Sequence, residues 1–182
     1  MIIKNILPKS LKEEIYNILM GRYMPWFWND TATAHENDIN SNEETFQFIH
    51  LFYSENNVIS DKYNLVVPIL WFFEKETNIK IKNIIRIKAN LNFRYLMTDK
   101  DKLDAIHKDY LNENFLSIIY YVNDSDGDTL IYDEKGNVAQ TITPQANSLV
   151  YFKSNTAHAG IFPVKNKKRI VINLVVEIEP FK

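Results

Sequence analysis

The stretch FLSIIYYVNDSDGDTLIYDEKGNVAQTI, residues 115–142, indicates the fold class of this chain. Runs of β-branched and aromatic residues alternate in it with two clusters of turn-forming residues, at 123–127 and 134–137. Branched and aromatic side chains suit a pleated surface, whereas Asn, Asp and Gly favour tight turns. The stretch therefore predicts three strands, at 115–122, 129–132 and 138–142.

The same pattern continues on both sides of this stretch. Turn signals separated by about 8 to 12 residues are typical of an antiparallel sandwich or barrel. We therefore expect an α+β chain that is mainly β, with a β-rich core at 83–182 after a helical N-terminal part at 1–82. The further predicted strands are 83–92, 148–152, 157–161 and 168–178, with another turn at 144–147.

Two helices are predicted in the N-terminal part. Ser10 and Glu13 form a capping box that would begin the first helix, and Gly21 would end it. The second covers 61–75 if Pro68 lies in its first turn. The apolar positions that support these helices are Leu11, Ile15, Ile18 and Leu19 in the first, and Leu65, Val66, Ile69, Leu70 and Phe73 in the second.

The intervening stretch, 23–44, is predicted to be a loop. It begins with the aromatic run 23–28, which we interpret as core or lid packing, and continues with Asn, Asp, Thr, Ser and Glu. A second long segment, 93–106, is charged and could be a flap over the substrate or a solvated loop. Both loops would shape the substrate site.

Composition excludes several classes of protein. With 182 residues, 46% hydrophobic and 24% charged, the chain fits one globular domain at 1–182. A net charge of -2 makes nucleic acid an unfavoured partner. The longest apolar run, 65–73, is far shorter than the roughly 20 residues that cross a bilayer, and no signal peptide is evident, so we expect a cytoplasmic protein. Because there is no cysteine, a metal site would need His and carboxylate ligands.

Three residues in the β-rich part suit such a site. His107 and Asp109 form an H-x-D unit, and residues i and i+2 of an extended segment point to the same face. His158 lies 49 residues beyond Asp109, far enough to belong to another strand. Two imidazoles and one carboxylate are the facial ligand set of non-haem iron(II) oxygenases, which leaves three metal positions open. The remaining histidines, His35 and His50, are interpreted as structural.

Arg169 stands at the beginning of the apolar strand 168–178. A buried guanidinium without an anionic partner is costly, so a strand of this kind should begin with Arg only if an anion meets it. The planar guanidinium binds a carboxylate through two parallel charge-assisted hydrogen bonds. Arg169 therefore predicts a site for a dicarboxylate that would chelate the metal at its other end.

In this order, the H-x-D unit, the distal His and Arg169 resemble the 2-oxoglutarate- and iron(II)-dependent dioxygenase superfamily, in its prolyl-4-hydroxylase-like branch. Supporting segments that match the branch in order are 118–123, 126–129 and 150–152. The N-terminal half is similar to small stand-alone members encoded by bacteriophages, at 5–8, 25–28, 46–50 and 86–90. The resemblance covers nearly the whole chain.

The resemblance implies a double-stranded β-helix, also called a jelly roll or cupin-like fold. It implies an enzyme that hydroxylates an unactivated C–H bond with Fe(II), 2-oxoglutarate and O2, and releases succinate and CO2. The substrate would be a small molecule or a peptide, with a prolyl or other amino-acid residue as the target. No acid or base beyond the metal ligands is expected to be catalytic.

Residue by residue, the resemblance implies the cosubstrate contacts. Arg169 matches the basic residue that binds the distal carboxylate of 2-oxoglutarate, and Tyr121 matches a tyrosine whose hydroxyl reaches the same carboxylate. Asn90 and Asn92 are similar to paired polar positions that touch the cosubstrate. The sequence departs from the branch where Asp126-Gly127 replaces a double glycine and where the Tyr-x-x-Gly before H-x-D is missing.

Two other function classes stay open. The first is a non-catalytic jelly-roll binding module with a vestigial metal site. The second is an oxygenase that acts on nucleic-acid bases, which would need a basic surface around the barrel mouth. The primary substrate and the oligomeric state are open at this stage.

Overall fold

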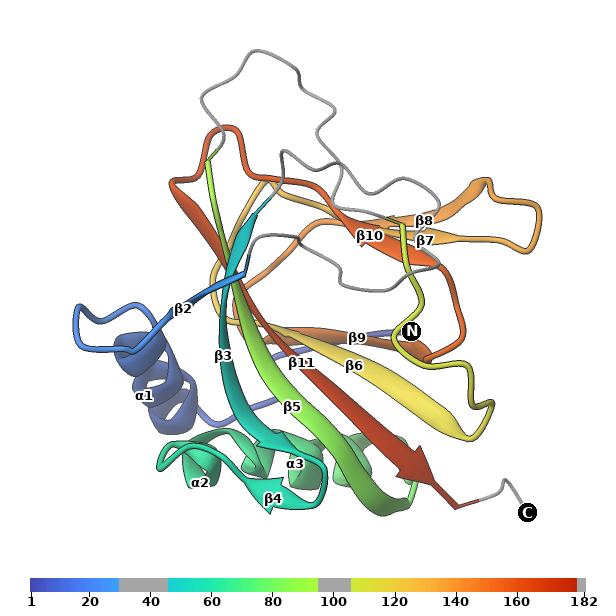
Figure 1. Cartoon of the computed structure of the whole chain (residues 1–182), viewed down its shortest axis with the longest axis horizontal. Coiled ribbons are helices and arrows are strands. Elements are labelled where there is room, and N and C mark those ends of the chain that lie inside the picture. The colour runs from blue at the N-terminus through green and yellow to red at the C-terminus, as the bar shows by residue number, and fades with distance from the viewer. Residues whose placement is uncertain (30–45, 95–105, 180–182) are drawn as a thin grey trace.

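The computed structural model describes residues 1–29, 46–94 and 106–179. Strands dominate, and three helices lie in the N-terminal half (Figure 1). The elements are β1 (Ile2–Lys4), α1 (Lys9–Leu19), β2 (Phe27–Asn29), β3 (Gln47–Ser54), β4 (Asn57–Val58), α2 (Tyr63–Val66), α3 (Pro68–Thr77), β5 (Ile81–Phe93), β6 (Phe115–Tyr121), β7 (Thr129–Tyr132), β8 (Val138–Ile142), β9 (Ser148–Lys153), β10 (His158–Gly160) and β11 (Lys168–Ile178).

The strands form two antiparallel sheets. The large sheet has the order β1-β9-β6-β11-β5-β3-β2, with β4 paired to β3, and the small sheet has the order β10-β7-β8. The helices lie on one side of the large sheet and the small sheet on the other (Figure 1). This is the mainly β, antiparallel jelly-roll fold that the sequence predicted.

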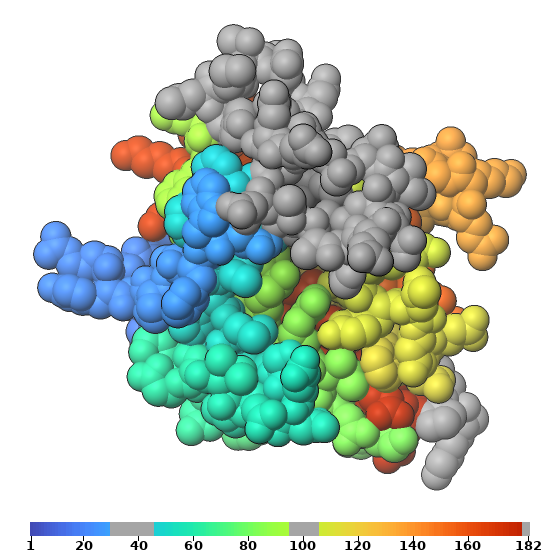
Figure 2. Space-filling view, in the orientation of Figure 1, coloured from blue at the N-terminus to red at the C-terminus, as the bar shows by residue number. Residues whose placement is uncertain are grey.

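The strand predictions of the β-rich part are confirmed. Each of the seven observed strands from β5 to β11 begins and ends within two residues of its predicted bounds. Their side chains alternate between the two faces of a sheet, and apolar branched residues occupy most of the buried positions. In the space-filling view, the N-terminal residues up to α3 form one side of the molecule and residues 106–121 the other, with β5 visible between them (Figure 2).

The N-terminal part is less helical than predicted. β3 lies in the large sheet, where it pairs with β5 from Phe48↔Leu91 to Ser54↔Arg86. β2 pairs with β3 and falls inside the predicted loop 23–44, so that prediction is wrong for 27–29. The strand is only three residues long and is stabilised by its pairing with β3, which a local sequence pattern does not show. Residues 30–44 and most of 93–106 lie outside the described residues.

Both helix predictions need correction at their boundaries. The chain leaves Pro8 in an extended conformation, and Pro8 is the N-cap of α1. Ser10 is then the second residue of the helix and cannot be its N-cap, so the predicted capping box is wrong. Pro68 does begin a helix, α3, but the predicted helix 61–75 is divided there because proline lacks the N–H that would continue α2.

The large sheet has a different environment on each face. Helices α1 to α3 pack on the outer face, where the fully buried side chains include Ile15, Phe52, Ile69, Phe73 and Ile172. The inner face meets the small sheet through a smaller apolar cluster made of Ile119, Tyr121, Ile131, Ile142, Val150 and Val171. Among the described helices, none has the length and apolar character that a membrane span requires.

Candidate metal centre

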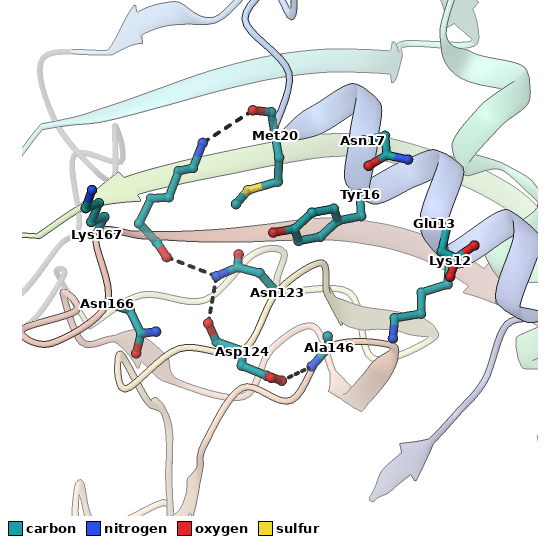
Figure 3. Close-up of a pocket in the computed structure, with 11 residues that line it drawn as sticks. Lys12, Glu13, Tyr16, Asn17, Met20, Asn123, Asp124, Ala146, Asn166 and Lys167 are labelled. Carbon is teal, nitrogen blue, oxygen red and sulfur yellow. Dashed lines mark hydrogen bonds between the residues drawn. The ribbon is translucent and has the colours of Figure 1, made fainter.

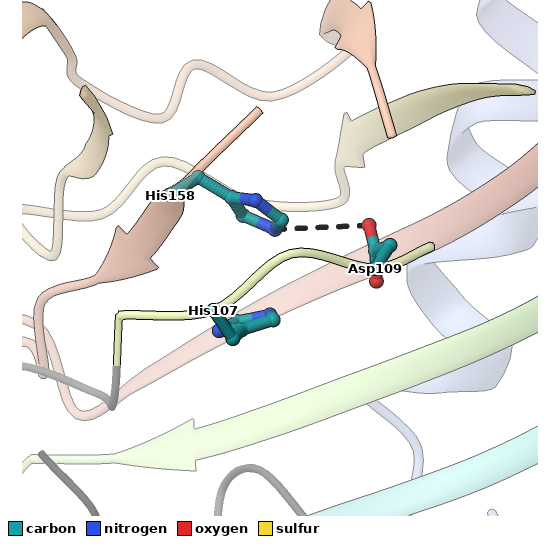
Figure 4. Close-up of side chains that lie close together, drawn as sticks. All are labelled: His107, Asp109 and His158. Carbon is teal, nitrogen blue, oxygen red and sulfur yellow. Dashed lines mark ion pairs between the residues drawn. The ribbon is translucent and has the colours of Figure 1, made fainter. Parts of the chain in front are cut away.

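The structure brings together the three residues that the sequence assigned to the metal. His107, Asp109 and His158 each offer one ligand atom, and these atoms lie within 4.8 Å of one another (Figure 4). Backbone pairing causes this convergence, because His107 and His158 exchange two N–H···O bonds, of 3.0 and 2.9 Å. The two imidazole rings lie 4.4 Å apart between centroids. The segment before β6 and the strand β10 thus meet at the site.

His158 presents one ring nitrogen to the site. Its Nδ1 lies 3.1 Å from the carbonyl oxygen of Thr156, which can only accept a hydrogen bond. Nδ1 therefore carries the proton, and the lone pair of Nε2 is free to bind a metal. This Nε2 lies 3.7 Å from Oδ2 of Asp109. The Phe152 ring packs at 4.8 Å from the His158 ring and limits its rotation.

Asp109 is a buried carboxylate with several charged neighbours. Burial raises its pKa, but His158, Arg86 and His107 lower it by more, so the pKa lies well below the ordinary value. The carboxylate is therefore ionised at neutral pH. An anionic oxygen beside two imidazole nitrogens is a donor set that suits iron(II).

Arg169 lies in the same part of the barrel and is buried. Its Nε donates to the carbonyl oxygen of Gly127 at 2.8 Å, and its Nη2 donates to Oγ1 of Thr129 at 2.8 Å. A Cβ on Gly127 would collide with the backbone carbonyl of Ile161, so only glycine allows this turn to close around the Arg169 side chain. A Cβ on Gly160 would lie 3.5 Å from Nη1 of Arg169.

Tyr121 reaches Arg169 through a third residue that the sequence analysis missed. Its hydroxyl donates to Oγ1 of Thr129 at 2.9 Å, and burial raises the pKa of Tyr121. The Thr129 oxygen thus accepts from both Tyr121 and Arg169, which occupies its two lone pairs. Its own proton is left to donate. A Thr at the start of a strand is ordinary, so the sequence offered no signal for this role.

One family profile matches this chain over residues 93–176, and its description is the 2OG-Fe(II) oxygenase superfamily. The matched range includes the triad, Tyr121 and Arg169. This part of the chain, residues 93–176, therefore has the sequence pattern of the 2OG-Fe(II) oxygenase superfamily. The chain is accordingly an oxidoreductase that depends on Fe(II), 2-oxoglutarate and O2.

Solved structures share the fold of this oxygenase. A Trichoplax adhaerens prolyl hydroxylase in complex with a hypoxia inducible factor peptide fragment has a TM-score of 0.63 at 18% identity, covering 97% of this chain and 82% of that one. A Pseudomonas putida prolyl-4-hydroxylase has a TM-score of 0.58 at 12% identity, with coverages of 98% and 92%. A Burkholderia pseudomallei oxidoreductase of the 2OG-Fe(II) oxygenase family reaches 0.70 at 9% identity, with 97% and 84%. No curated protein sequence matches the chain.

One pocket of the oxygenase is lined by both histidines of the triad and by Arg169. Asn90 and Asn92 both line it, together with His107, Ile119, Thr129, His158, Ala159, Gly160, Arg169, Val171 and Asn173. Among the residues that the structure describes, Oδ1 of Asn90 is buried without a hydrogen-bond partner. A buried acceptor that has no hydrogen-bond partner and faces a pocket indicates that a ligand or a water molecule donates the missing hydrogen bond. The residues present therefore fit a metal with a polar cosubstrate.

His50, which was predicted to be structural, is not among the residues that line this pocket. Nδ1 of His50 donates to the carbonyl of Pro25 at 2.7 Å, and Nε2 lies 2.8 Å from the Ser60 hydroxyl, which fits a structural role. His35 lies outside the described residues.

A larger cavity, about 510 Å³, lies between α1 and the segments 123–124 and 166–168 (Figure 3). Tyr16 of α1 and Met20, the C-cap of that helix, form one wall of it, and the turn after β6 forms the other. Asn123 in that turn accepts a hydrogen bond from the Ile170 N–H and donates to the Lys168 carbonyl, so it holds the backbone on both sides of Arg169. The polar groups of this wall are thus used to shape the strand that carries Arg169.

Proposed function

We propose that this chain is a hydroxylase in which His107, Asp109 and His158 hold iron(II) and Arg169 binds the distal carboxylate of 2-oxoglutarate. The observation that carries the proposal is the pocket that His107, His158 and the buried guanidinium of Arg169 line together. A linear dicarboxylate that bound the metal at one end would extend along this pocket toward the guanidinium. When bound, the iron supplies the oxidising chemistry that couples decarboxylation of 2-oxoglutarate to hydroxylation of a C–H bond with O2.

The chain's own groups would bind and orient the cosubstrate. Arg169 offers a charge-assisted donor, and its Nε and Nη2 are already held by Gly127 and Thr129, so the guanidinium is preorganised. The remaining proton of Thr129 would point to the same carboxylate, while Tyr121 acts through Thr129. The buried Oδ1 of Asn90 would accept a hydrogen bond from a water molecule in the pocket or from a water bound to the cosubstrate.

The substrate is proposed to be a prolyl or other amino-acid residue of a peptide, as in the prolyl-4-hydroxylase-like branch. Support comes from the fold shared with two prolyl hydroxylases, one of them bound to a peptide fragment. The fold is also shared with the epimerase SnoN in complex with nogalamycin RO, so a small molecule is the alternative. A bacteriophage origin and a cytoplasmic location stay predictions.

An anaerobic titration with iron(II) and then 2-oxoglutarate tests the proposal. We expect a visible metal-to-ligand charge-transfer band and, after O2 is admitted, succinate. Asp109→Ala should abolish both, whereas Asp133→Ala, which removes an exposed carboxylate in the β7–β8 turn, should leave both unchanged. A folded wild-type protein without the band would favour a non-catalytic binding module instead, and decarboxylation retained in Asp109→Ala would refute the ligand assignment.

A further inference from the structure

The carboxylate of Asp109 is held by donors from three neighbouring strands. Nη2 of Arg86 in β5 donates to Oδ1 at 2.7 Å, and the Ser117 hydroxyl in β6 donates to Oδ2 at 2.6 Å. Nδ2 of Asn173 in β11 donates to Oδ2 at 3.1 Å. The segment that carries Asp109 belongs to none of these strands, so the large sheet determines where this carboxylate lies.

The register of the sheet puts the three donors on one patch of its inner face. Val175 of β11 pairs with Arg86 on one side and with Ser117 on the other, so these residues form one row across three strands. Asn173 lies two residues from Val175 and therefore on the same face. A slip of one residue in any of these pairings would turn its donor away from Asp109.

Arg86 also sets the orientation of Asn173. The same Nη2 that binds Asp109 lies 3.3 Å from Oδ1 of Asn173, so the amide oxygen faces the guanidinium and the amide nitrogen faces the carboxylate. Oδ1 of Asp109 is thereby directed toward β5. Oδ2 is the oxygen recorded 3.7 Å from Nε2 of His158.

Stability alone does not account for Arg86. Its side chain is 17% exposed and that of Asp109 is 4% exposed, and replacing a buried ion pair by apolar residues is often neutral or stabilising. In the described part of the chain, Nε of Arg86 is buried without a hydrogen-bond partner, which adds a further cost. The guanidinium lies over the Tyr110 ring at 5.5 Å, a contact that does not need Asp109. What the Arg86–Asp109 pair specifically provides is a fixed orientation of the Asp109 carboxylate.

We propose that Arg86 is a positioning residue of the metal site which, with Ser117 and Asn173, fixes the rotation of the Asp109 carboxylate so that only one of its oxygens faces the metal. This inference rests on the proposed function, because it requires the triad to bind a metal. A carboxylate that was free to rotate could bind through both oxygens and take up a further metal position. Arg86 therefore preserves an open position for cosubstrate or oxygen.

Cobalt(II) titration of the purified chain without 2-oxoglutarate tests this role, since cobalt(II) reports its coordination through its visible d–d spectrum. Arg86→Met keeps the length of the side chain and removes the donor. We expect it to weaken cobalt(II) binding about tenfold or more, the usual effect of losing a partner of a metal ligand, and to change the spectrum. Arg86→Lys should recover part of the affinity, because one charged donor remains.

Lys82→Met is the matched control. Lys82 lies on the same strand and pairs with Glu177 at 2.8 Å, but at an exposed end of the sheet. It should bind cobalt(II) with wild-type affinity and spectrum. If Arg86→Met behaves like this control, the positioning role is refuted.

Two further outcomes are distinguishable. If the folded wild-type chain does not bind cobalt(II), the proposed metal site itself fails and the inference fails with it. If circular dichroism shows that Arg86→Met is unfolded, Ser117→Ala and Asn173→Ala test the same restraint. Each is expected to change the cobalt(II) spectrum, and wild-type spectra and affinities in both would refute the inference.

Discussion

The two faces of the large sheet differ in composition and in use, although the same strands build both. In β11, Ile170, Ile172 and Leu174 face the helices and are almost completely buried, whereas Arg169 and Asn173 face the barrel interior. The alternation of side chains along a strand makes this separation possible. The outer face can therefore supply stability while the inner face carries polar chemistry.

Polar and charged side chains are buried on the inner side of the large sheet, and burying such a group without a partner costs free energy. Asp109, Ser117, Thr129, Arg169 and Asn173 are all buried, and each takes part in a hydrogen bond to another residue of this set or to Arg86 or Gly127. Buried polar groups are tolerated when they are paired in this way. The outer face needs no such network, because its side chains are apolar. Substitutions on the two faces should therefore have different consequences.

The largest effect on function is expected from His107→Ala on the inner side. Removing one of three ligands should lower iron(II) affinity by more than about a hundredfold and abolish 2-oxoglutarate turnover. Because His107 is only partly buried, thermal unfolding should change little. Iron(II) titration and a melting curve measure both effects, and turnover retained by a folded variant would contradict the assignment.

The largest effect on stability is expected from Phe73→Ala on the outer face. Phe73 is fully buried against the sheet and contacts the Tyr151 ring edge to face at 5.1 Å. Its truncation should lower the free energy of unfolding by about 3 to 5 kcal/mol, as measured by urea denaturation. The fraction that stays folded should bind iron(II) with unchanged affinity. A loss of affinity in that fraction would mean that the two faces are coupled.

Arg169→Ala should separate the two ends of the pocket. We expect the 2-oxoglutarate concentration needed for half-maximal turnover to rise more than about tenfold, because a charge-assisted hydrogen bond is lost. Iron(II) affinity without cosubstrate should be unchanged. Steady-state kinetics and an iron titration provide the two readings, and an unchanged cosubstrate requirement would exclude this residue from carboxylate binding.

Thr129→Val tests the residue that connects Tyr121 to Arg169. Valine preserves the shape but removes the hydroxyl, so the expected rise in the 2-oxoglutarate requirement is about five- to tenfold. Thr129→Ser retains the hydroxyl and serves as the control. Equal kinetics for the valine and serine variants would show that the hydroxyl does not reach the cosubstrate.

The smallest expected effect is on the pH dependence of the free energy of unfolding, through His50. Burial lowers the pKa of His50 below the ordinary value of 6.5, with the Pro25 carbonyl acting in the opposite direction. The unfolded chain therefore binds this proton more readily, and stability should fall as pH drops through 6.5 toward the lower folded value. Urea denaturation across this range should show a smaller fall in His50→Gln than in the wild type. Identical slopes would assign the pH dependence to other groups.

Elements formed by local interactions could be predicted from the sequence, whereas elements that depend on contacts with distant parts of the chain could not. Strands β5 to β11 could be predicted because each has its own β-branched pattern and its own turn signals. β3 was not predicted, although it lies between β5 and β2 in the large sheet, because its mixture of aromatic and polar residues lacks a clear β-branched pattern. The capping box at Ser10 failed for a local reason, since the N-cap of α1 is Pro8, two residues before the position that the motif implies.

The sequence by itself determined the strand pattern and the residue types of the candidate metal triad and of Arg169, because periodicity and ligand chemistry are properties of single segments. The tertiary structure alone placed Arg86, Ser117 and Asn173 around Asp109 and put Thr129 between Tyr121 and Arg169. These are ordinary strand residues with no motif of their own. Their roles arise from the register between strands that are distant in the chain, and register depends on packing across the whole sheet.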